Sequence, residues 1–390
     1  MLEKTIARLA AARGRRVWLV GGPVRDRLLG RSGGDVDLAI DGAVRDIGRS
    51  AARELGGTFR WHPRFLTGRI ELPDAHVDLA RTRTESYDAP AALPRVTPGT
   101  IEDDLGRRDF AINAMALELR PRGRAKVLDP FDGQADLAAG VLRVLHDRSF
   151  VDDPTRAFRA LRFATRFGFR LDPPTRRWMR AAIGDEAHHR LSAQRVTAEL
   201  RQAAREPRPS SVLRAFARAG LDSCWGGGTL SPGLRYALPR LARFRPSPTI
   251  FFGLAFGHRK LGARQELAKR LRLTRAETRS LVEGPARVEE IFRRVRAARG
   301  RAALDRACSA AAAADLIQAA ATADPRTFRR ISGWWQGIRT VELRIDGNDL
   351  RAAGLPPGPG IARALARARA ALIEGRARDR EAQLRVALRT

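Results

Sequence analysis

Asp35 and Asp37 are the two residues whose type and spacing most directly suggest chemistry. The apolar run 36–40 predicts a β-strand, so both carboxylates should project from the same face of it. Paired carboxylates offer the hard oxygen ligands that Mg²⁺ prefers, with substrate phosphates completing the metal's shell. Because such pairs are also common as ordinary strand or turn residues, the neighbouring motifs must decide whether they bind a metal.

A glycine turn precedes the two aspartates. Gly21 and Gly22 end the apolar run 17–20, and residues 24–29 have helical spacing. The pattern predicts a strand, a tight turn and a helix. The backbone N–H groups of the turn and the guanidinium of Arg25 could then bind a triphosphate. An ordinary turn between a strand and a helix is the alternative.

Further elements must position these motifs. The apolar patterns predict a helix at 43–56 and strands near 57–61, 66–72 and 75–81. Residues 86–100 contain three prolines, which predicts an extended loop in place of a regular element. Mixed strands and helices of this kind predict an α+β fold for the first part of the chain.

From Asp136 onward the pattern is helical almost to the end of the chain. Stretches rich in proline and glycine interrupt it and mark connections between helices or joints between domains. We therefore predict an α+β domain at 1–135 and three helical parts at 136–210, 211–330 and 331–390.

The composition excludes several classes of protein. The chain has 390 residues, of which 44% are hydrophobic, so it is too apolar for a disordered tail and long enough for several cores. It contains no run of roughly 20 uncharged apolar residues and begins with no signal-peptide pattern, so no membrane partner and a cytoplasmic location are expected. Cys224 and Cys308 lack neighbours at metal-ligand spacing, so neither disulfides nor a zinc site is predicted.

The formal net charge of +30 favours a polyanionic partner, because each cation placed near a phosphate releases counterions. Nearly all of this charge is arginine in a sequence rich in alanine, glycine and proline. A coding bias toward G and C could produce the same composition. Charge alone therefore favours nucleic-acid binding without establishing it.

Five motifs occur in series along the first half of the chain. In order they are GGPVRDRLLG (21–30), DVDLAI (35–40), RRDFAINAMA (107–116), DPFDGQADLAAGVLRVL (129–145) and FVDDPTRAFRALRFATRFGF (150–169). Their order and spacing resemble those of the class II tRNA nucleotidyltransferases, the CCA-adding enzymes, and of bacterial poly(A) polymerases. The resemblance implies a nucleotidyltransferase head of the polymerase-β type with a mixed β-sheet, at 1–135, followed by an all-α neck, body and tail.

The resemblance implies a role for the acidic residues and the glycine turn. Asp35 and Asp37 would bind two metal ions, Mg²⁺, that activate the primer 3′-hydroxyl and stabilise the leaving pyrophosphate. Asp78 would be a third catalytic carboxylate, whereas an exposed strand acid is its plain alternative. Gly22 and Arg25 correspond to positions that contact the nucleotide.

Four residues of the third motif resemble the family element that holds the ribose and triphosphate. Arg107 and Arg108 could donate to phosphate oxygens, and Asp109 could accept from a ribose hydroxyl. Asn113 could do either. A salt bridge at the start of a helix is the alternative for this segment.

The last motif resembles the element that recognises the incoming base. Asp153 would accept and Arg156 would donate hydrogen bonds, which together imitate the edge of a template base. Arg159 and Arg162 match further arginines that contact the nucleotide. Without the family, these acids would be read as the N-cap of a helix. Asp152 stands where the family usually has glutamate.

These implications predict an enzyme, a template-independent CCA tRNA nucleotidyltransferase that uses CTP and ATP. Basic helices around 287–301 and 361–380 would bind tRNA phosphates. The proline-rich segment 86–100 differs from the flexible segment of many family members, so CC-adding and A-adding enzymes remain alternatives. A poly(A) polymerase would be expected to carry a longer basic extension, and a catalytically silent RNA-binding protein would be expected to lose its site residues. The sequence does not indicate an oligomeric state.

Overall fold

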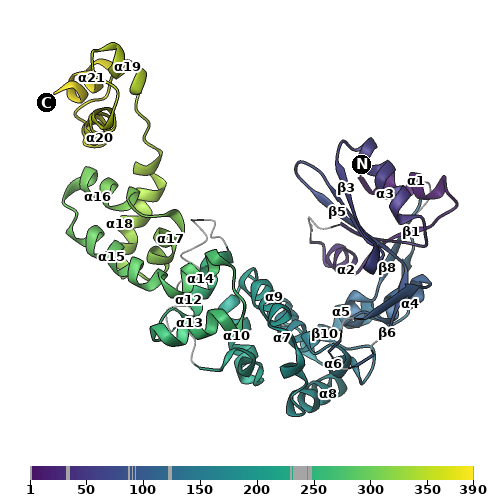
Figure 1. Cartoon of the computed structure of the whole chain (residues 1–390). Coiled ribbons are helices and arrows are strands. Elements are labelled where there is room, and N and C mark those ends of the chain that lie inside the picture. Colours follow the sequence, from purple (N-terminus) through teal and green to yellow (C-terminus); the bar gives the residue numbers. More distant parts are fainter. Residues whose placement is uncertain are drawn as a thin grey trace. The chain divides into compact units, whose positions relative to one another are not determined.

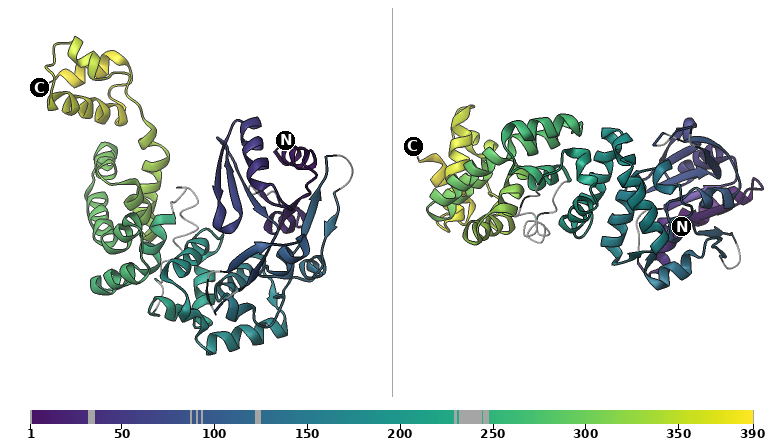
Figure 2. Two further views of the ribbon diagram at one scale, coloured as in Figure 1. Left: turned by 45° about the vertical axis from the view of Figure 1, so that its right-hand side comes forward. Right: turned by 90° about the horizontal axis from the view of Figure 1, so that it is seen from below.

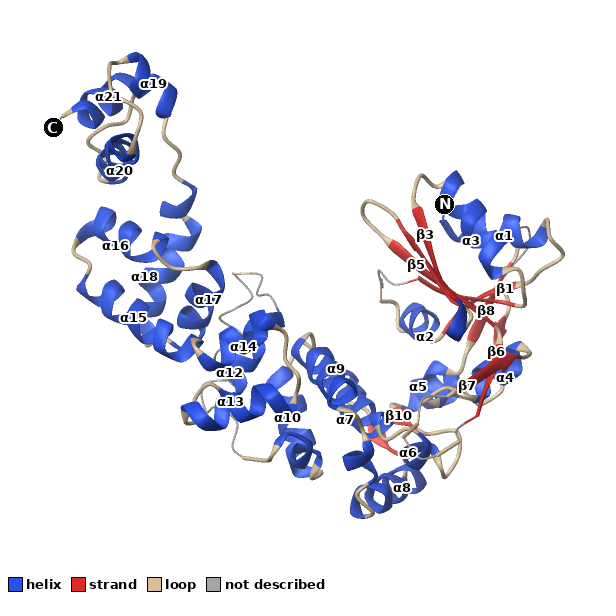
Figure 3. Ribbon diagram, viewed as in Figure 1, coloured by secondary structure: helices blue, strands red, loops and turns tan. Residues whose placement is uncertain are grey.

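The computed structural model describes residues 2–31, 36–86, 88–89, 91–92, 94–121, 125–228, 231, 244 and 248–389. The chain forms two compact units, the first comprising residues 1–199 and 214–224, and the second 200–213 and 225–390. Every described strand belongs to the first unit, and the regular structure described in the second is helical (Figures 1 and 3). The predicted fold class, an α+β head followed by an all-α region, is confirmed.

The head contains a mixed sheet of seven strands in the order β3-β4-β5-β2-β1-β8-β9. Only β2 and β5 run parallel, and the other neighbouring strands are antiparallel. The strands of this sheet are β1 (Val17–Val20), β2 (Val36–Ile40), β3 (Thr58–His62), β4 (Thr67–Glu71), β5 (His76–Arg81), β8 (Ala116–Leu119) and β9 (Val127–Leu128).

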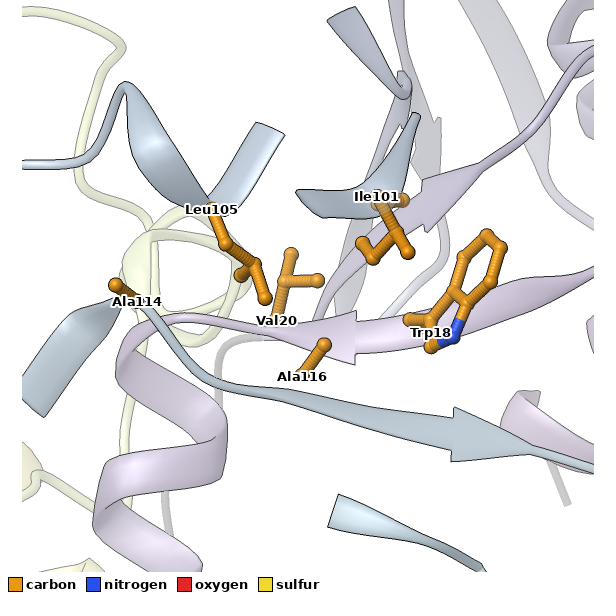
Figure 4. Packing of buried hydrophobic residues seen from close by; sticks show 7 residues of the cluster. Trp18, Val20, Ile101, Leu105, Ala114 and Ala116 are labelled. Atoms are coloured by element: carbon orange, nitrogen blue, oxygen red, sulfur yellow. The ribbon is translucent and has the colours of Figure 1, made fainter. Parts of the chain in front are cut away.

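All four residues of β1 are buried, because helices cover both faces of the central strands. Trp18 and Val20 point to one face, where they pack against Ile101 and Leu105 (Figure 4). Helices α1 (Leu2–Ala11) and α3 (Val44–Glu54) lie side by side on the sheet (Figure 2).

The alternation of side chains along β2 decides where the acidic residue of this strand lies. Ala39 is opposite Trp18 and belongs to the same buried cluster. Asp37 is two residues away, so its side chain projects from that same face of the sheet. The sheet thus places a carboxylate at the edge of a hydrophobic cluster.

The first unit also contains two small sheets. Strands β6 (Arg83–Ser86) and β7 (Arg95–Pro98) form an antiparallel pair, and β10 (Val141–Leu142) lies parallel to β11 (Arg170–Leu171). The remaining helices that begin in this unit are α2 (Gly22–Leu28), α4 (Ile101–Gly106), α5 (Gly133–Ala139), α6 (Ser149–Asp152), α7 (Thr155–Phe167), α8 (Pro173–Gly184) and α9 (Ala193–Ala204).

The prediction of an extended loop over 86–100 is wrong for residues 95–98, which form β7. A two-stranded pair has an outward-facing edge on each strand, and a proline is tolerated at such an edge because no ladder hydrogen bond is lost there. Pro98 lies at the end of β7, opposite Arg83. The region after Asp136, predicted as helical almost to the end, also contains the two-residue strands β10 and β11.

The second unit is built from helices, with α10 beginning in it. They are α10 (Pro209–Arg218), α12 (Phe251–Phe256), α13 (Leu261–Arg270), α14 (Arg275–Val282), α15 (Gly284–Ala297), α16 (Gly300–Ser309), α17 (Ala313–Thr322), α18 (Pro325–Gln336), α19 (Gly347–Ala352), α20 (Pro359–Ile373) and α21 (Arg380–Leu388). Each helix of the described chain is too short or too polar to cross a lipid bilayer.

The last three helices enclose a small core of their own. Ile345, Leu350, Ala364, Ala368 and Ala387 are buried together there. This cluster contains small residues at i and i+4 on α20, which let α21 approach closely. The predicted division of the helical region into neck, body and tail remains a prediction.

Candidate active site

A recess of about 420 Å³ in the first unit brings together residues that are far apart in the sequence. Ten of the predicted site residues line it, and they are Gly22, Arg25, Asp37, Arg107, Arg108, Asp109, Asn113, Asp153, Arg156 and Arg159. Glu85, Thr155 and Phe163 complete the lining. We call this recess the arginine pocket. Five arginines line it together with the acidic residues Asp37, Glu85, Asp109 and Asp153.

Three of the remaining four predicted residues lie elsewhere. Asp35 falls outside the described residues. Gly21 lies behind the arginine pocket, Asp78 lines an adjoining recess, and Arg162 is buried on α7.

The adjoining recess also has a volume of about 420 Å³, and Asp37 and Arg108 line both recesses. Asp37 and Asp78 are register partners on the parallel strands β2 and β5, so their side chains share one face of the sheet. Arg69, opposite Asp78 on β4, donates two hydrogen bonds of 2.7 Å to its carboxylate. The structure therefore places two of the predicted catalytic carboxylates side by side, one of them paired with an arginine.

The glycine turn has a backbone that only glycine adopts easily. Gly21 precedes α2 with φ of 73°, in the left-handed region. A Cβ atom at this position would collide with Nη1 of Arg108. The backbone N–H of Gly21 donates to the carbonyl of Met115 at 3.1 Å, which joins the turn to β8. Gly21 thus allows the Arg108 guanidinium to lie directly against the main chain.

Asp104 is a residue of the site that the sequence analysis missed. Its side chain is fully buried at the end of α4 and accepts hydrogen bonds from Arg107 at 2.8 Å and Arg108 at 2.9 Å. Burial alone would raise the pKa of Asp104, but the two guanidinium groups hold it below its ordinary value. The spacing of an aspartate three and four residues before two arginines on a helix could have revealed it.

A chain of hydrogen bonds connects three motifs across the arginine pocket. Nη1 of Arg25 donates to Oδ1 of Asn113 at 2.7 Å, and Nδ2 of Asn113 donates to Asp109 at 2.9 Å. Nε of Arg159 donates to the other oxygen of Asp109 at 2.7 Å.

Burial raises the pKa of Asp109, but Arg159 and Asn113 outweigh it and leave the pKa lowered. The attraction of Asp109 in turn raises the pKa of Arg159. Burial lowers the pKa of Arg25, whose guanidinium lies 4.8 Å from the ring centroid of Phe167. The site is therefore a connected set of charges in fixed orientations.

The predicted base-reading pair consists of two residues with separate partners. Oδ1 of Asp153 accepts from the backbone N–H of Thr155 at 2.9 Å and from Nη2 of Arg195 at 2.6 Å. Nη2 of Arg156 donates to the carbonyl of Arg107 at 2.8 Å. Pro154 is the N-cap of α7, and Asp153 precedes it and accepts from the N–H and the hydroxyl of Thr155, the first residue of the helix.

Arg195 is the second site residue that the sequence analysis missed. It comes from α9 and also donates to the carbonyl of Ala91 at 3.0 Å. No local spacing could have indicated this partner, because 42 residues separate it from Asp153. Asp152 does not line the arginine pocket and lies 3.5 Å from Arg148 through its carboxylate.

Arg162 lies outside both recesses described above. It is buried on α7, with its Nε 3.8 Å from a carboxylate oxygen of Glu199 and its guanidinium over the ring of Phe163. Burial raises the pKa of Glu199. These contacts support the wall of the pocket at Phe163, and the predicted nucleotide contact of Arg162 stays a prediction.

The arrangement suits a nucleoside triphosphate. Guanidinium groups can hold phosphate oxygens, and Asp37 lies at the boundary between the two recesses. Carboxylate oxygens there are the donors that a hard divalent cation prefers. Within the described chain, which excludes Asp35, no cluster of three or more His, Cys, Asp or Glu side chains forms a metal site.

Known proteins resemble both the head and the whole chain. Residues 17–143 match the family described as the poly A polymerase head domain. An A-adding tRNA nucleotidyltransferase of Geobacter sulfurreducens is 30% identical over 404 residues, covering 96% of this chain and 45% of that protein. A CC-adding tRNA nucleotidyltransferase of Deinococcus radiodurans is 41% identical over 217 residues, covering 55% of each chain. This chain therefore spans only about half the length of these relatives.

A solved structure extends the similarity to the full length. The Thermotoga maritima CCA-adding enzyme complexed with tRNA is 27% identical, with a TM-score of 0.62, and the match covers 99% of this chain and 94% of that one. The head with its mixed sheet and the helical region agree with the fold that the sequence resemblance implied. The chain belongs to the family of class II tRNA nucleotidyltransferases and bacterial poly(A) polymerases.

Proposed function

We propose that this protein is a nucleotidyltransferase that adds nucleotides to the 3′ end of tRNA from CTP and ATP, releasing pyrophosphate. The observation that carries the proposal is the arginine pocket, in which motifs between residues 22 and 159 meet in one recess. The names of the relatives and of the solved structure support tRNA as the acceptor.

In this proposal the arginine pocket binds the triphosphate before any chemistry occurs. Arg108 is held by Asp104 at 2.9 Å and lies against the Gly21 backbone, so its guanidinium is oriented in advance. Nε of Arg108 is buried without a hydrogen-bond partner among the described residues. A phosphate oxygen would satisfy that donor. Asp109, whose oxygens already accept from Asn113 and Arg159, would orient these two side chains.

Mg²⁺ is the cofactor that we propose for the carboxylates. Asp35 and Asp37 would hold it, and the Asp78 carboxylate on the same face of the sheet is chemically suited to assist. When bound, the metal would stabilise the charge that develops on the reacting phosphate and the attacking hydroxyl. The residues' own part is to supply fixed oxygen donors beside the arginines that hold the phosphates.

Base selection is assigned to Asp153 and Arg156. Within the described chain, the Asp153 carboxylate accepts its hydrogen bonds from Thr155 and Arg195 on Oδ1, which leaves Oδ2 available. We propose that Oδ2 accepts from the exocyclic amino group of cytosine or adenine, while Arg156 donates to the adjacent ring nitrogen. Uracil and guanine present the opposite pattern of donor and acceptor.

Complete C-C-A synthesis is the product that we propose. A partial activity is the second candidate, because the relatives include A-adding and CC-adding enzymes. To separate them, the purified protein would be incubated with tRNA transcripts that end before the CCA, after C or after CC. CTP, ATP or both would be supplied, and product lengths measured. Extension of all three ends to CCA supports the proposal, whereas arrest at CC, use of CC ends only, or long A tails would each replace it.

The metal assignment has its own test. Asp37→Ala should abolish incorporation and leave tRNA binding within about twofold of the unchanged chain, because the carboxylate acts on the reacting groups. Asp74→Ala, a change of an exposed acid in the turn before β5, is the matched control and should retain activity. Full incorporation by Asp37→Ala would reject the assignment.

A further inference from the structure

A separate recess of about 390 Å³ lies on α7, α8 and α10, within the first unit. It shares no lining residue with the arginine pocket or its neighbour. Its apolar lining is Leu161, Leu171, Met179, Ile183, Ala215 and Ala219. We call it the helical recess. Its volume is within the range of pockets that bind small ligands.

Three arginines surround this apolar surface. Arg176 and Arg180 are four residues apart on α8, and Arg218 ends α10. All three are exposed, and their side chains have no partner among the described residues. No acidic side chain lines the recess. The arginines of the proposed active site differ in this respect, because those described above are held by hydrogen bonds or ion pairs.

The chemistry of the recess selects its ligand. Unpaired guanidinium groups favour an anion, and their planar donors match the oxygens of a phosphate. An aliphatic floor of this size favours a flat apolar face next to that phosphate. Long arginine stems also cover apolar surface on ordinary protein exteriors, so the arrangement must be distinguished from a solvated face.

We propose that the helical recess binds one nucleotide of a single-stranded RNA segment, with the base on the aliphatic floor and its phosphates on the three arginines. The site is distinct from the one proposed for nucleotide addition. This proposal rests on the proposed function in one respect, because we take the bound RNA to be the tRNA that the enzyme extends. Binding at this site can be measured without any incorporation.

The test uses the full chain and an eight-nucleotide single-stranded RNA that carries one 4-thiouridine. Photo-crosslinking followed by mass spectrometry should place a crosslink within residues 161–183 or 215–219. In parallel, fluorescence anisotropy would measure affinity for the same RNA. The triple change Arg176→Gln, Arg180→Gln and Arg218→Gln should weaken binding about tenfold or more, because three phosphate contacts are lost.

A matched control removes the same charge from another helix. Arg45, Arg49 and Arg53 on α3 are also exposed and have no side-chain partner among the described residues. Their joint change to glutamine should weaken binding less than threefold. Equal losses in both triple variants would show general charge attraction and overturn the proposal. Thermal unfolding of each variant confirms that the fold is retained.

A second variant tests the floor without altering charge. Ala219→Leu enlarges an apolar side chain that lines the helical recess and should weaken RNA binding about fivefold by filling the recess. Unchanged affinity would show that no base enters the recess, and the proposal would fail. Crosslinks confined to residues 107–159, which belong to the arginine pocket, would also overturn it. Competition by an acidic peptide but not by a nucleotide would overturn it as well. Failure here with normal CTP incorporation would leave the proposed enzyme function intact.

Discussion

The fully buried carboxylate of Asp104 orients two arginines of the pocket, Arg107 and Arg108, so a change of this one residue should affect both. Asp104→Asn preserves the shape of the side chain and removes its charge. We expect the KM for CTP to rise about tenfold or more with a smaller change in kcat, because Arg107 and Arg108 lose their fixed orientation. Steady-state kinetics checks this, and Glu102→Gln, a change of an exposed acid on the same helix, is the control.

The same residue predicts a pH dependence of stability. Its pKa is lowered in the folded state, so the ionised carboxylate stabilises the fold above the unfolded value of about 3.9. That contribution is lost as the pH falls through the lowered folded value. The difference in unfolding free energy between the unchanged chain and Asp104→Asn should therefore be largest near neutral pH and shrink below about pH 4. Urea unfolding at several pH values measures it, and a difference that grows with acidity would contradict the assignment.

At the level of single residues, the sequence allows contacts within one motif to be predicted from spacing. It does not allow contacts between distant motifs to be predicted. Asp104 lies one helical turn from Arg107 and Arg108, so its role follows from spacing. Arg195 reaches Asp153 only because α9 packs near α7 in the folded unit, and no sequence pattern records that approach. Pairing of Arg69 with Asp78 depends on strand register in the same way.

At the scale of elements, the turn between β1 and α2 gives a controlled comparison. Gly21 and Gly30, at the two ends of α2, both have positive φ, of 73° and 65°. A Cβ atom at Gly21 would strike Arg108, whereas at Gly30 no atom lies within 4 Å. Positive φ strains alanine at both positions, and the ψ of −130° at Gly21 lies outside the left-handed helical region that alanine can enter. We expect Gly21→Ala alone to raise the KM for CTP, by about tenfold. Equal kinetics in both variants would remove the steric role assigned to Gly21.

A second comparison concerns how α20 is attached to α16. Asp305 accepts from Arg369 at 2.8 Å and from the indole N–H of Trp334 at 2.8 Å. Asp305→Ala would leave the buried indole N–H of Trp334 without its acceptor, whereas the half-buried Arg369 would keep its hydrogen bonds to the carbonyls of Val341 and Ile338. The second unit should therefore lose about 1–3 kcal/mol of stability. Thermal unfolding followed by tryptophan fluorescence would show it. The control Glu342→Ala changes an exposed acid of the same unit and should leave the midpoint unchanged.

Prediction of elements succeeded where apolar spacing was strong and failed where proline dominated. The strands at 17–20 and 36–40 have the predicted bounds because continuous apolar runs have few alternatives. Residues 95–98 were predicted as loop because of Pro94 and Pro98, yet a two-stranded pair needs few ladder donors. Whether such a segment forms a strand depends on its glycine and proline content and also on the strand that pairs with it. The local sequence does not identify that partner strand.

For the whole molecule, the net charge of +30 can now be divided into two populations of arginine. Those of the arginine pocket are engaged with neighbouring groups, and many of the others are exposed. If exposed arginines bind tRNA phosphates, the logarithm of affinity should fall linearly with the logarithm of salt concentration, with a slope of about −3 or steeper. Filter binding between about 50 and 300 mM salt checks this. A slope near zero would show that the exposed arginines do not bind tRNA phosphates. The excess of positive charge would then be attributed to the coding bias toward G and C.

The hydrogen bonds of the arginine pocket also bear on how the protein is made. Arg25 and Asn113 are 88 residues apart, and Asp109 and Arg159 are separated by 50. Contacts between such distant segments close large loops and form late in folding. During synthesis from the N-terminus, the sheet can therefore assemble before any nucleotide can be held. A nascent chain released before Arg159 emerges should fold the seven-stranded sheet and yet fail to retain CTP, so ligand binding would report the completion of the arginine pocket.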